Sequence, residues 1–142
     1  MARSSKSTFP TAAPSGERAG TILLIDDDED VRTALAANLR DDGYTVREFT
    51  SPPSSPESLN LGDVDVVISD YRTGGTDGLL LADGLHRTHP RLPVVLITAY
   101  WSHHLENEAA RRGNVHLWRK PFDYEELYAW LAGMQPPARA EC

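Results

Sequence analysis

The chain has 142 residues, of which 40% are hydrophobic and 25% are charged, as expected for one globular domain with a hydrophobic core. Its 21 acidic side chains outnumber the 14 basic ones and give a net charge of -7, which argues against direct binding to DNA. No apolar run reaches the roughly 18 residues that could cross a membrane, and the only cysteine, Cys142, cannot form an internal disulfide, so a cytoplasmic location is expected.

Predicted strands and helices alternate after an N-terminal leader. Residues 1–20 are rich in Ser, Thr, Ala, Pro and Gly without periodicity, which predicts a disordered leader. Runs of apolar and β-branched residues predict buried strands at 21–25, 64–69, 93–97 and 115–118, with a more polar edge strand at 45–49. Helical spacing predicts helices between Asp28 and Gly43, at 77–89, at 101–112 and from Asp123 to about 134, and Pro56 begins a short one.

The alternation of five strands with five helices predicts an α/β fold. Right-handed crossovers between such strands give a flavodoxin-like, doubly wound, five-stranded parallel sheet with helices on both faces. The expected strand order for a chain of this length is 2-1-3-4-5. In sheets of this kind ligands bind at the carboxyl ends of the strands, so the residues at those ends are the candidate functional residues.

Polar side chains stand at the carboxyl ends of four predicted strands. Asp26 and Asp27 follow the first strand, Asp70 the third, Thr98 the fourth and Lys120 the fifth. Parallel strands end on one rim of the sheet, so these side chains converge. Carboxylates this close repel one another, and a hard divalent cation such as Mg²⁺ removes that conflict. An aspartate can act as a nucleophile, and an ammonium with a hydroxyl suits phosphoryl oxygens, so this set predicts acceptance of a phosphoryl group.

At these positions the chain resembles the receiver domains of two-component response regulators. The resemblance is carried by Leu-Ile-Asp-Asp at 24–27, Ser-Asp at 69–70, Asp-Gly at 77–78, Thr-Ala at 98–99 and Lys-Pro-Phe at 120–122. Each motif is common by itself, but here all of them occur in order at predicted strand ends. The likeness extends from residue 21 to about 134, which predicts a receiver domain at 21–135 and a C-terminal tail at 136–142.

The resemblance implies a role for each of these residues. Asp70 would be the phosphoacceptor, Asp26, Asp27, Asp70 and the backbone carbonyl of Arg72 would bind Mg²⁺, and Thr98 and Lys120 would bind the phosphoryl oxygens. The Lys120–Pro121 peptide is expected to be cis. The partner would be a sensor histidine kinase or a histidine phosphotransfer protein. The domain would catalyse only its own phosphoryl transfer and dephosphorylation, and would signal through an unknown downstream protein.

Three features of the sequence bear on how the phosphorylated state would behave: a loop, a switch position and a pair of variable positions. The loop after the acceptor reads Thr73-Gly74-Gly75, whereas the family usually has Met-Pro there. Leu117 stands where the family's switch has Tyr or Phe. Arg72 and Tyr100 occupy the two variable positions that tune loss of the phosphoryl group in the family. Because both are bulky and could exclude water, a long-lived phosphorylated state is predicted.

Alternative interpretations remain open at this point. Asp26 and Asp28 could form the Asp-x-Asp motif of a small aspartate-nucleophile phosphohydrolase, and the domain could also be a binding module that works without phosphorylation. Asp28 and Asp77 are expected to cap helices, and the five histidines show no zinc-binding pattern. Tyr124 and Tyr128 form either an exposed aromatic strip or a partly buried pair. The face made by the last two helices and the fifth strand meets partners in the family, and a homodimer through it is a further expectation.

Overall fold

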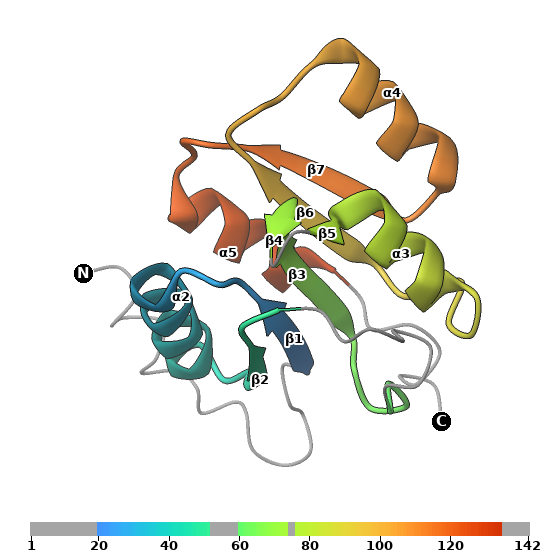
Figure 1. The fold of residues 1–142 in the computed structure, drawn as a ribbon. Coiled ribbons are helices and arrows are strands. Elements are labelled where there is room, and N and C mark those ends of the chain that lie inside the picture. Colours follow the sequence, from blue (N-terminus) through green and yellow to red (C-terminus); the bar gives the residue numbers. More distant parts are fainter. Residues whose placement is uncertain (1–19, 52–59, 74–75, 135–142) are drawn as a thin grey trace.

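Five parallel strands form the centre of the molecule in the computed structural model, which describes residues 20–51, 60–73 and 76–134 (Figure 1). The strands are β1 (Thr21–Ile25), β2 (Thr45–Phe49), β3 (Val66–Asp70), β6 (Val94–Thr98) and β7 (Val115–Arg119). They lie in the order β2-β1-β3-β6-β7. The predicted doubly wound order is therefore confirmed, with the polar strand β2 at one edge.

Two helices cover each face of the sheet (Figure 1). They are α2 (Glu29–Asp41), α3 (Gly78–His86), α4 (His103–Arg112) and α5 (Tyr124–Gly133). Side chains of α3 and α4 pack with Leu23, Ile25 and Val67 on one face, while those of α2 and α5 pack with Ile22 and Leu24 on the other. The described part of the chain thus has four helices where five were predicted, and the short helix expected from Pro56 lies outside the described residues.

The central strands owe their position to apolar side chains on both faces. All five residues of β1 and of β6 are buried, as a parallel strand covered by helices on both sides requires. Successive side chains of a strand point to opposite faces, so one apolar run supplies both halves of the core. The sequence signal for these strands was therefore a continuous run rather than an alternation.

Each helix begins at a side chain that caps it. Asp28 accepts a hydrogen bond from the Val31 amide at 3.2 Å, and Asp77 accepts one from the Leu79 amide at 2.7 Å. Ser102 and Asp123 cap α4 and α5 in the same way. These caps satisfy backbone donors that have no partner inside the helix. The capping roles predicted for Asp28 and Asp77 are confirmed.

The structure corrects some sequence predictions in detail. Tyr128 is only 3% exposed while Tyr124 is 40% exposed, so the exposed strip of two tyrosines is wrong for Tyr128. An additional antiparallel hairpin, β4 (Arg72–Thr73) with β5 (Thr76–Asp77), was not predicted. The predicted leader at 1–20, apart from Gly20, and the tail at 136–142 lie outside the described residues. No helix in the described segments is long and apolar enough to cross a membrane.

Candidate functional site

The register of the sheet brings the predicted site residues to one rim. Ile25 of β1 pairs with Ser69 of β3, so the residues that follow them, Asp26 and Asp70, are neighbours. On its other side Asp70 pairs with Ile97 of β6, one residue before Thr98. The Lys120 amide donates a hydrogen bond to the Thr98 carbonyl at 2.7 Å. The pairing of β6 with β7 therefore extends one residue beyond the end of β7. All five predicted side chains therefore start from adjacent strand ends.

Three carboxylates meet at this rim. One carboxylate oxygen from each of Asp26, Asp27 and Asp70 lies within 4.8 Å of the others. Asp26 is buried, Asp70 is half-buried and Asp27 is exposed, so the cluster has a closed floor and an open mouth. Within the described segments this is the only group of three or more carboxylate, histidine or cysteine side chains close enough to hold one metal ion. None of the five histidines, which all lie in the described segments, belongs to this group.

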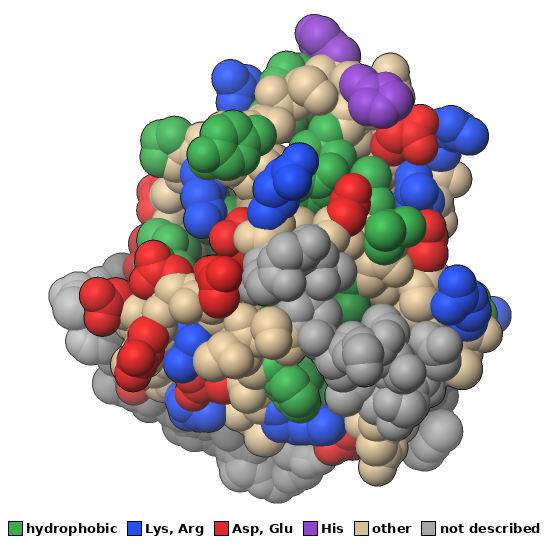
Figure 2. Space-filling view, in the orientation of Figure 1, with side chains coloured by type: hydrophobic (Ala, Val, Ile, Leu, Met, Phe, Trp, Pro, Cys, Tyr) green, Lys and Arg blue, Asp and Glu red, His purple; other side chains and the backbone are tan. Residues whose placement is uncertain are grey.

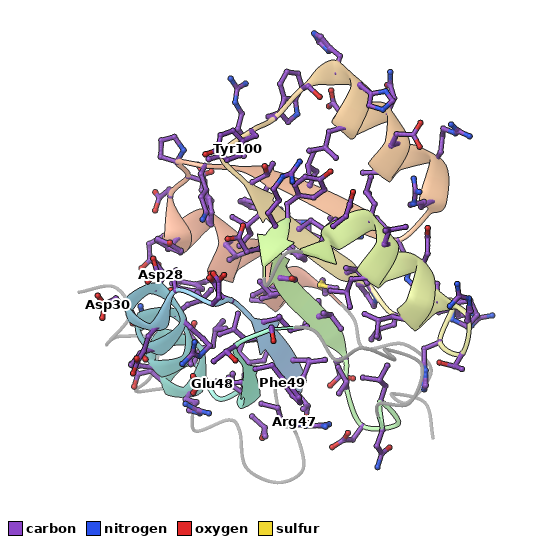
Figure 3. All side chains as sticks on the ribbon, viewed as in Figure 1. Asp28, Asp30, Arg47, Glu48, Phe49 and Tyr100 are labelled. Carbon is purple, nitrogen blue, oxygen red and sulfur yellow. The ribbon has the colours of Figure 1, made fainter. Side chains whose placement is uncertain are left out.

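Backbone hydrogen bonds fix the position of Asp26. Its amide donates to the Phe49 carbonyl of β2 at 3.1 Å, and its Oδ1 accepts from the Asp28 amide at 2.9 Å. Figure 3 labels Asp28 at the start of α2 and Phe49 on β2. Asp26 is therefore held between the edge strand and the first turn of α2. The Asp28 carboxylate itself caps α2, which leaves it unsuited to the second position of a phosphohydrolase motif.

The carboxylates of the cluster are close enough to repel one another, and this affects their pKa values. Burial raises the pKa of both Asp26 and Asp70 above the ordinary carboxyl value, because a buried carboxylate has lost water that stabilises its charge. The neighbouring carboxylates raise the pKa of each further. Lys120 opposes this rise at both residues, and the Asp28 amide at Asp26 and the Arg72 amide at Asp70 do the same through hydrogen bonds. A bound cation would relieve the remaining repulsion.

Lys120 and Thr98 complete the rim. Lys120 Nζ lies 3.9 Å from Asp70 Oδ2, and the Lys120–Pro121 peptide is cis as predicted. Thr98 is 1% exposed, and its hydroxyl oxygen accepts a hydrogen bond from the Tyr100 amide at 2.9 Å. The oxygen is thereby oriented, and its own hydrogen remains available for donation to a ligand.

Comparison with known proteins identifies the family. The family model described as the response regulator receiver domain matches residues 22–132. This chain belongs to the response regulator receiver family. The DNA-binding transcriptional regulator NtrC of Escherichia coli K12 is 34% identical over 110 residues, which are 78% of this chain and 24% of NtrC. The C4-dicarboxylate transport regulator DctD of Rhizobium meliloti is 34% identical over 117 residues, 82% of this chain and 24% of DctD. The receiver spans about a quarter of these relatives.

Solved structures of receivers have the same fold. The non-phosphorylated HemR receiver domain of Leptospira biflexa superposes with a TM-score of 0.75 at 23% identity, covering 83% of this chain and 98% of that one. A response regulator of Burkholderia pseudomallei, solved with a phosphorylated aspartic acid, a calcium ion and citrate, gives a TM-score of 0.68 at 26% identity. That match covers 86% of this chain and 72% of the other. The fold prediction is confirmed.

The acidic cluster of this receiver fits a magnesium ion. Mg²⁺ prefers oxygen ligands, takes one or two protein carboxylates and keeps several waters, which an open-mouthed site of three carboxylates allows. Acidic side chains also gather over the start of α2, where Figure 2 shows them as a red group, and they favour the approach of cations. The receiver family and the acidic cluster together make Mg²⁺ the expected ion.

The structure describes three of the residues expected to govern the phosphorylated state, Leu117, Tyr100 and Arg72. Leu117 packs against the core on the α3 and α4 side, while its neighbour Trp118 packs on the opposite face, with its ring 5.4 Å from that of Phe122. Tyr100 is 75% exposed and lines a surface hollow of about 460 Å³ together with Arg72. Gly74 and Gly75 lie outside the described residues, so their effect on the loop stays a prediction.

One contact to the receiver site was missed in the sequence. Arg32 Nη1 of α2 donates to the Asp26 carbonyl at 2.9 Å, while its Nε pairs with Glu48 of β2 at 3.1 Å. Arg32 and Glu48 are distant in sequence, and only the packing of α2 on β2 brings them together. The available sequence signal was an arginine in the first turns of α2, two positions after a run of five acidic residues, Asp26 to Asp30.

Proposed function

We propose that this receiver accepts a phosphoryl group on Asp70 from the phosphohistidine of a sensor kinase or a histidine phosphotransfer protein. One observation carries the proposal: Asp70 belongs to an acidic triad whose carboxylate oxygens lie within 4.8 Å of one another, and the Lys120 ammonium lies 3.9 Å from its Oδ2. A carboxylate with both a cation site and an ammonium beside it is suited to attack phosphorus, because the two positive charges offset the negative charge on the phosphoryl oxygens.

The transfer exchanges one bond to phosphorus for another. A carboxylate oxygen of Asp70 forms a bond to phosphorus as the bond to the histidine nitrogen breaks, and the leaving imidazole takes up a proton from solvent. Lys120 contributes its positive charge to a phosphoryl oxygen, and Thr98 donates its hydroxyl hydrogen to another. Mg²⁺, held by Asp26, Asp27, Asp70 and the Arg72 carbonyl, supplies charge neutralisation when bound. The solved Burkholderia regulator with its phosphorylated aspartic acid supports this assignment.

The output of the phosphorylated receiver is contact with another protein or onward phosphotransfer. Phosphorylation shifts an equilibrium between two conformations and so changes the surface that a partner meets. The face formed by α4, β7 and α5 is the candidate, and a homodimer through it is one form that the contact can take. The named relatives NtrC and DctD are transcriptional regulators, and the match covers only 24% of each, so their outputs are not transferred to this chain.

Incubation of the purified chain with a small phosphodonor tests the proposal. We expect stoichiometric labelling that requires Mg²⁺, is abolished in Asp70→Asn and persists in Asp83→Asn, a matched change on α3 away from the rim. Asp26→Asn is expected to weaken labelling through the metal without removing the acceptor. Turnover of a phosphate ester, abolished in Asp26→Asn, would support the phosphohydrolase instead. Absence of any labelling would support a binding module that works without phosphorylation.

A further inference from the structure

Two arginines of α2 bind one glutamate of β2 in nearly the same way. Arg32 Nε pairs with Glu48 Oε1 at 3.1 Å, and Arg40 Nη1 pairs with Glu48 Oε2 at 2.9 Å. Each arginine also donates to a backbone carbonyl: Arg32 to that of Asp26 at 2.9 Å, and Arg40 to that of Val46 at 2.8 Å. The two contacts differ mainly in location, since Asp26 belongs to the acidic site and Val46 to the middle of the edge strand.

The carbonyl that Arg32 contacts belongs to the peptide that joins Asp26 to Asp27. Its orientation sets the direction in which the chain leaves β1, and therefore the separation of the two carboxylates. The Asp26 amide is held by the Phe49 carbonyl, and its Oδ1 is held by the Asp28 amide. Glu48 and Phe49, labelled side by side on β2 in Figure 3, thus reach the same residue, one through Arg32 and the other directly.

We propose that Arg32 is a positioning residue for the metal site, which it serves by holding the Asp26–Asp27 peptide against Glu48 of β2. The Arg32 side chain is only 12% exposed, whereas that of Arg40 is 50% exposed, so the Arg32 bonds are better protected from competing water. Groups that orient metal ligands from behind typically change metal affinity by about 10- to 100-fold when removed. The inference rests on the proposed function, because it takes the acidic triad to be a Mg²⁺ site.

Positioning and simple electrostatics predict opposite results for the loss of Arg32. A guanidinium near an acidic cluster repels a cation, so its removal would tighten Mg²⁺ binding if charge alone mattered. Its partner Glu48 offsets much of that charge, and the remaining contribution of Arg32 is geometric. We therefore expect Arg32→Met, which keeps most of the aliphatic stem, to weaken Mg²⁺ binding by roughly tenfold.

The test is a Mg²⁺ titration of the full chain followed by amide NMR, which also reports whether each variant is folded. Arg40→Met is the matched control, because it removes an arginine from the same glutamate and frees a carbonyl away from the site. We expect Arg40→Met to bind Mg²⁺ as the wild type does. Arg32→Lys, which can reach one acceptor but not both, is expected to fall between the wild type and Arg32→Met.

The possible outcomes separate the two proposals. Unchanged or tighter Mg²⁺ binding by a folded Arg32→Met would overturn the positioning role and leave the proposed function standing. Equal weakening in Arg32→Met and Arg40→Met would also overturn it, since the effect would then come from general loosening of α2 on β2. If the wild type itself shows no Mg²⁺-dependent shifts at Asp27 and Asp70, the proposed metal site fails first. Should Arg32→Met be unfolded, the comparison of Arg32→Lys with Arg40→Met decides.

Discussion

Replacing Asp70 by Asn should stabilise the receiver in the absence of Mg²⁺. The carboxylate oxygens of Asp70, Asp26 and Asp27 lie within 4.8 Å of one another. Two unit charges at that limiting separation repel by about 3.5 kcal/mol at an effective dielectric constant of about 20, and Asp70 has two such neighbours. The attraction of Asp70 to Lys120, at 3.9 Å, offsets about 4 kcal/mol of this repulsion at the same dielectric constant. The net repulsion of about 3 kcal/mol is weakened by solvent at the open mouth of the site. We therefore expect Asp70→Asn to raise the free energy of unfolding by about 1–2 kcal/mol.

Thermal unfolding measures this gain directly. For a domain of this size about 1 kcal/mol corresponds to a rise in Tm of roughly 4 °C, so Asp70→Asn should melt about 4–8 °C above the wild type without Mg²⁺. Saturating Mg²⁺ should raise the Tm of the wild type and largely remove the difference, since the ion neutralises the same repulsion. Asp41→Asn, which removes a charge from the exposed end of α2, should leave the response to Mg²⁺ intact.

The stability difference between Asp70→Asn and the wild type should also depend on pH. The pKa of Asp70 is raised in the folded protein above its ordinary value of 3.8, mainly by burial, so the folded state holds the proton more tightly than the unfolded one. The wild type consequently loses stability as the pH rises from that value through the raised pKa, and Asp70→Asn does not share this part of the loss. The variant should be most favoured at neutral pH and least favoured near pH 3.8. A variant no more stable than the wild type at neutral pH without Mg²⁺ would refute this reasoning.

Two further changes test the packing and the lifetime of the phosphorylated state. A Cβ at Gly78 would lie 2.9 Å from Leu96 Cδ2, so Gly78→Ala should lower the free energy of unfolding, measured in urea, by about 1–3 kcal/mol. A Cβ at Gly133 would have nothing within 4 Å, so Gly133→Ala should be neutral or slightly stabilising. Equal effects of the two would contradict the close packing at Gly78. The wild type should lose its phosphoryl label slowly, and Tyr100→Ala should lose it several times faster if Tyr100 and Arg72 exclude water; equal rates would remove that explanation.

The sequence predicted what depends on local pattern and on the geometry of parallel sheets. The apolar run at β1 predicted a strand buried on both faces, and the common rim of parallel strands predicted that Asp26, Asp70 and Lys120 would meet. Both predictions needed only the side-chain pattern and the strand order. The helix caps at Asp28 and Asp77 followed from the same kind of local signal.

The features that were missed depend on tertiary packing. Tyr128 is buried because α5 lies against α2 on one face of the sheet, and the helical stripe of Leu127 and Leu131 alone does not show how wide that contact is. The contact of Arg32 with the Asp26 carbonyl requires α2 to be packed on β2, where Glu48 pairs in register with Leu24, two residues before Asp26. The departure at Leu117 was visible in the sequence, and the structure adds that its side chain packs on the α3 and α4 side.

Chemical trapping of the phosphorylated residue tests the central claim most directly. The chain would be incubated with a small phosphodonor and Mg²⁺, reduced with borohydride to convert an acyl phosphate to a stable alcohol, and mapped by peptide mass spectrometry. We expect the reduced side chain at Asp70 alone, with none in a sample prepared without Mg²⁺. Reduction at Asp26 or Asp27 with Asp70 intact, or labelling that persists without Mg²⁺, would contradict the assignment of Asp70 as the acceptor beside a metal site.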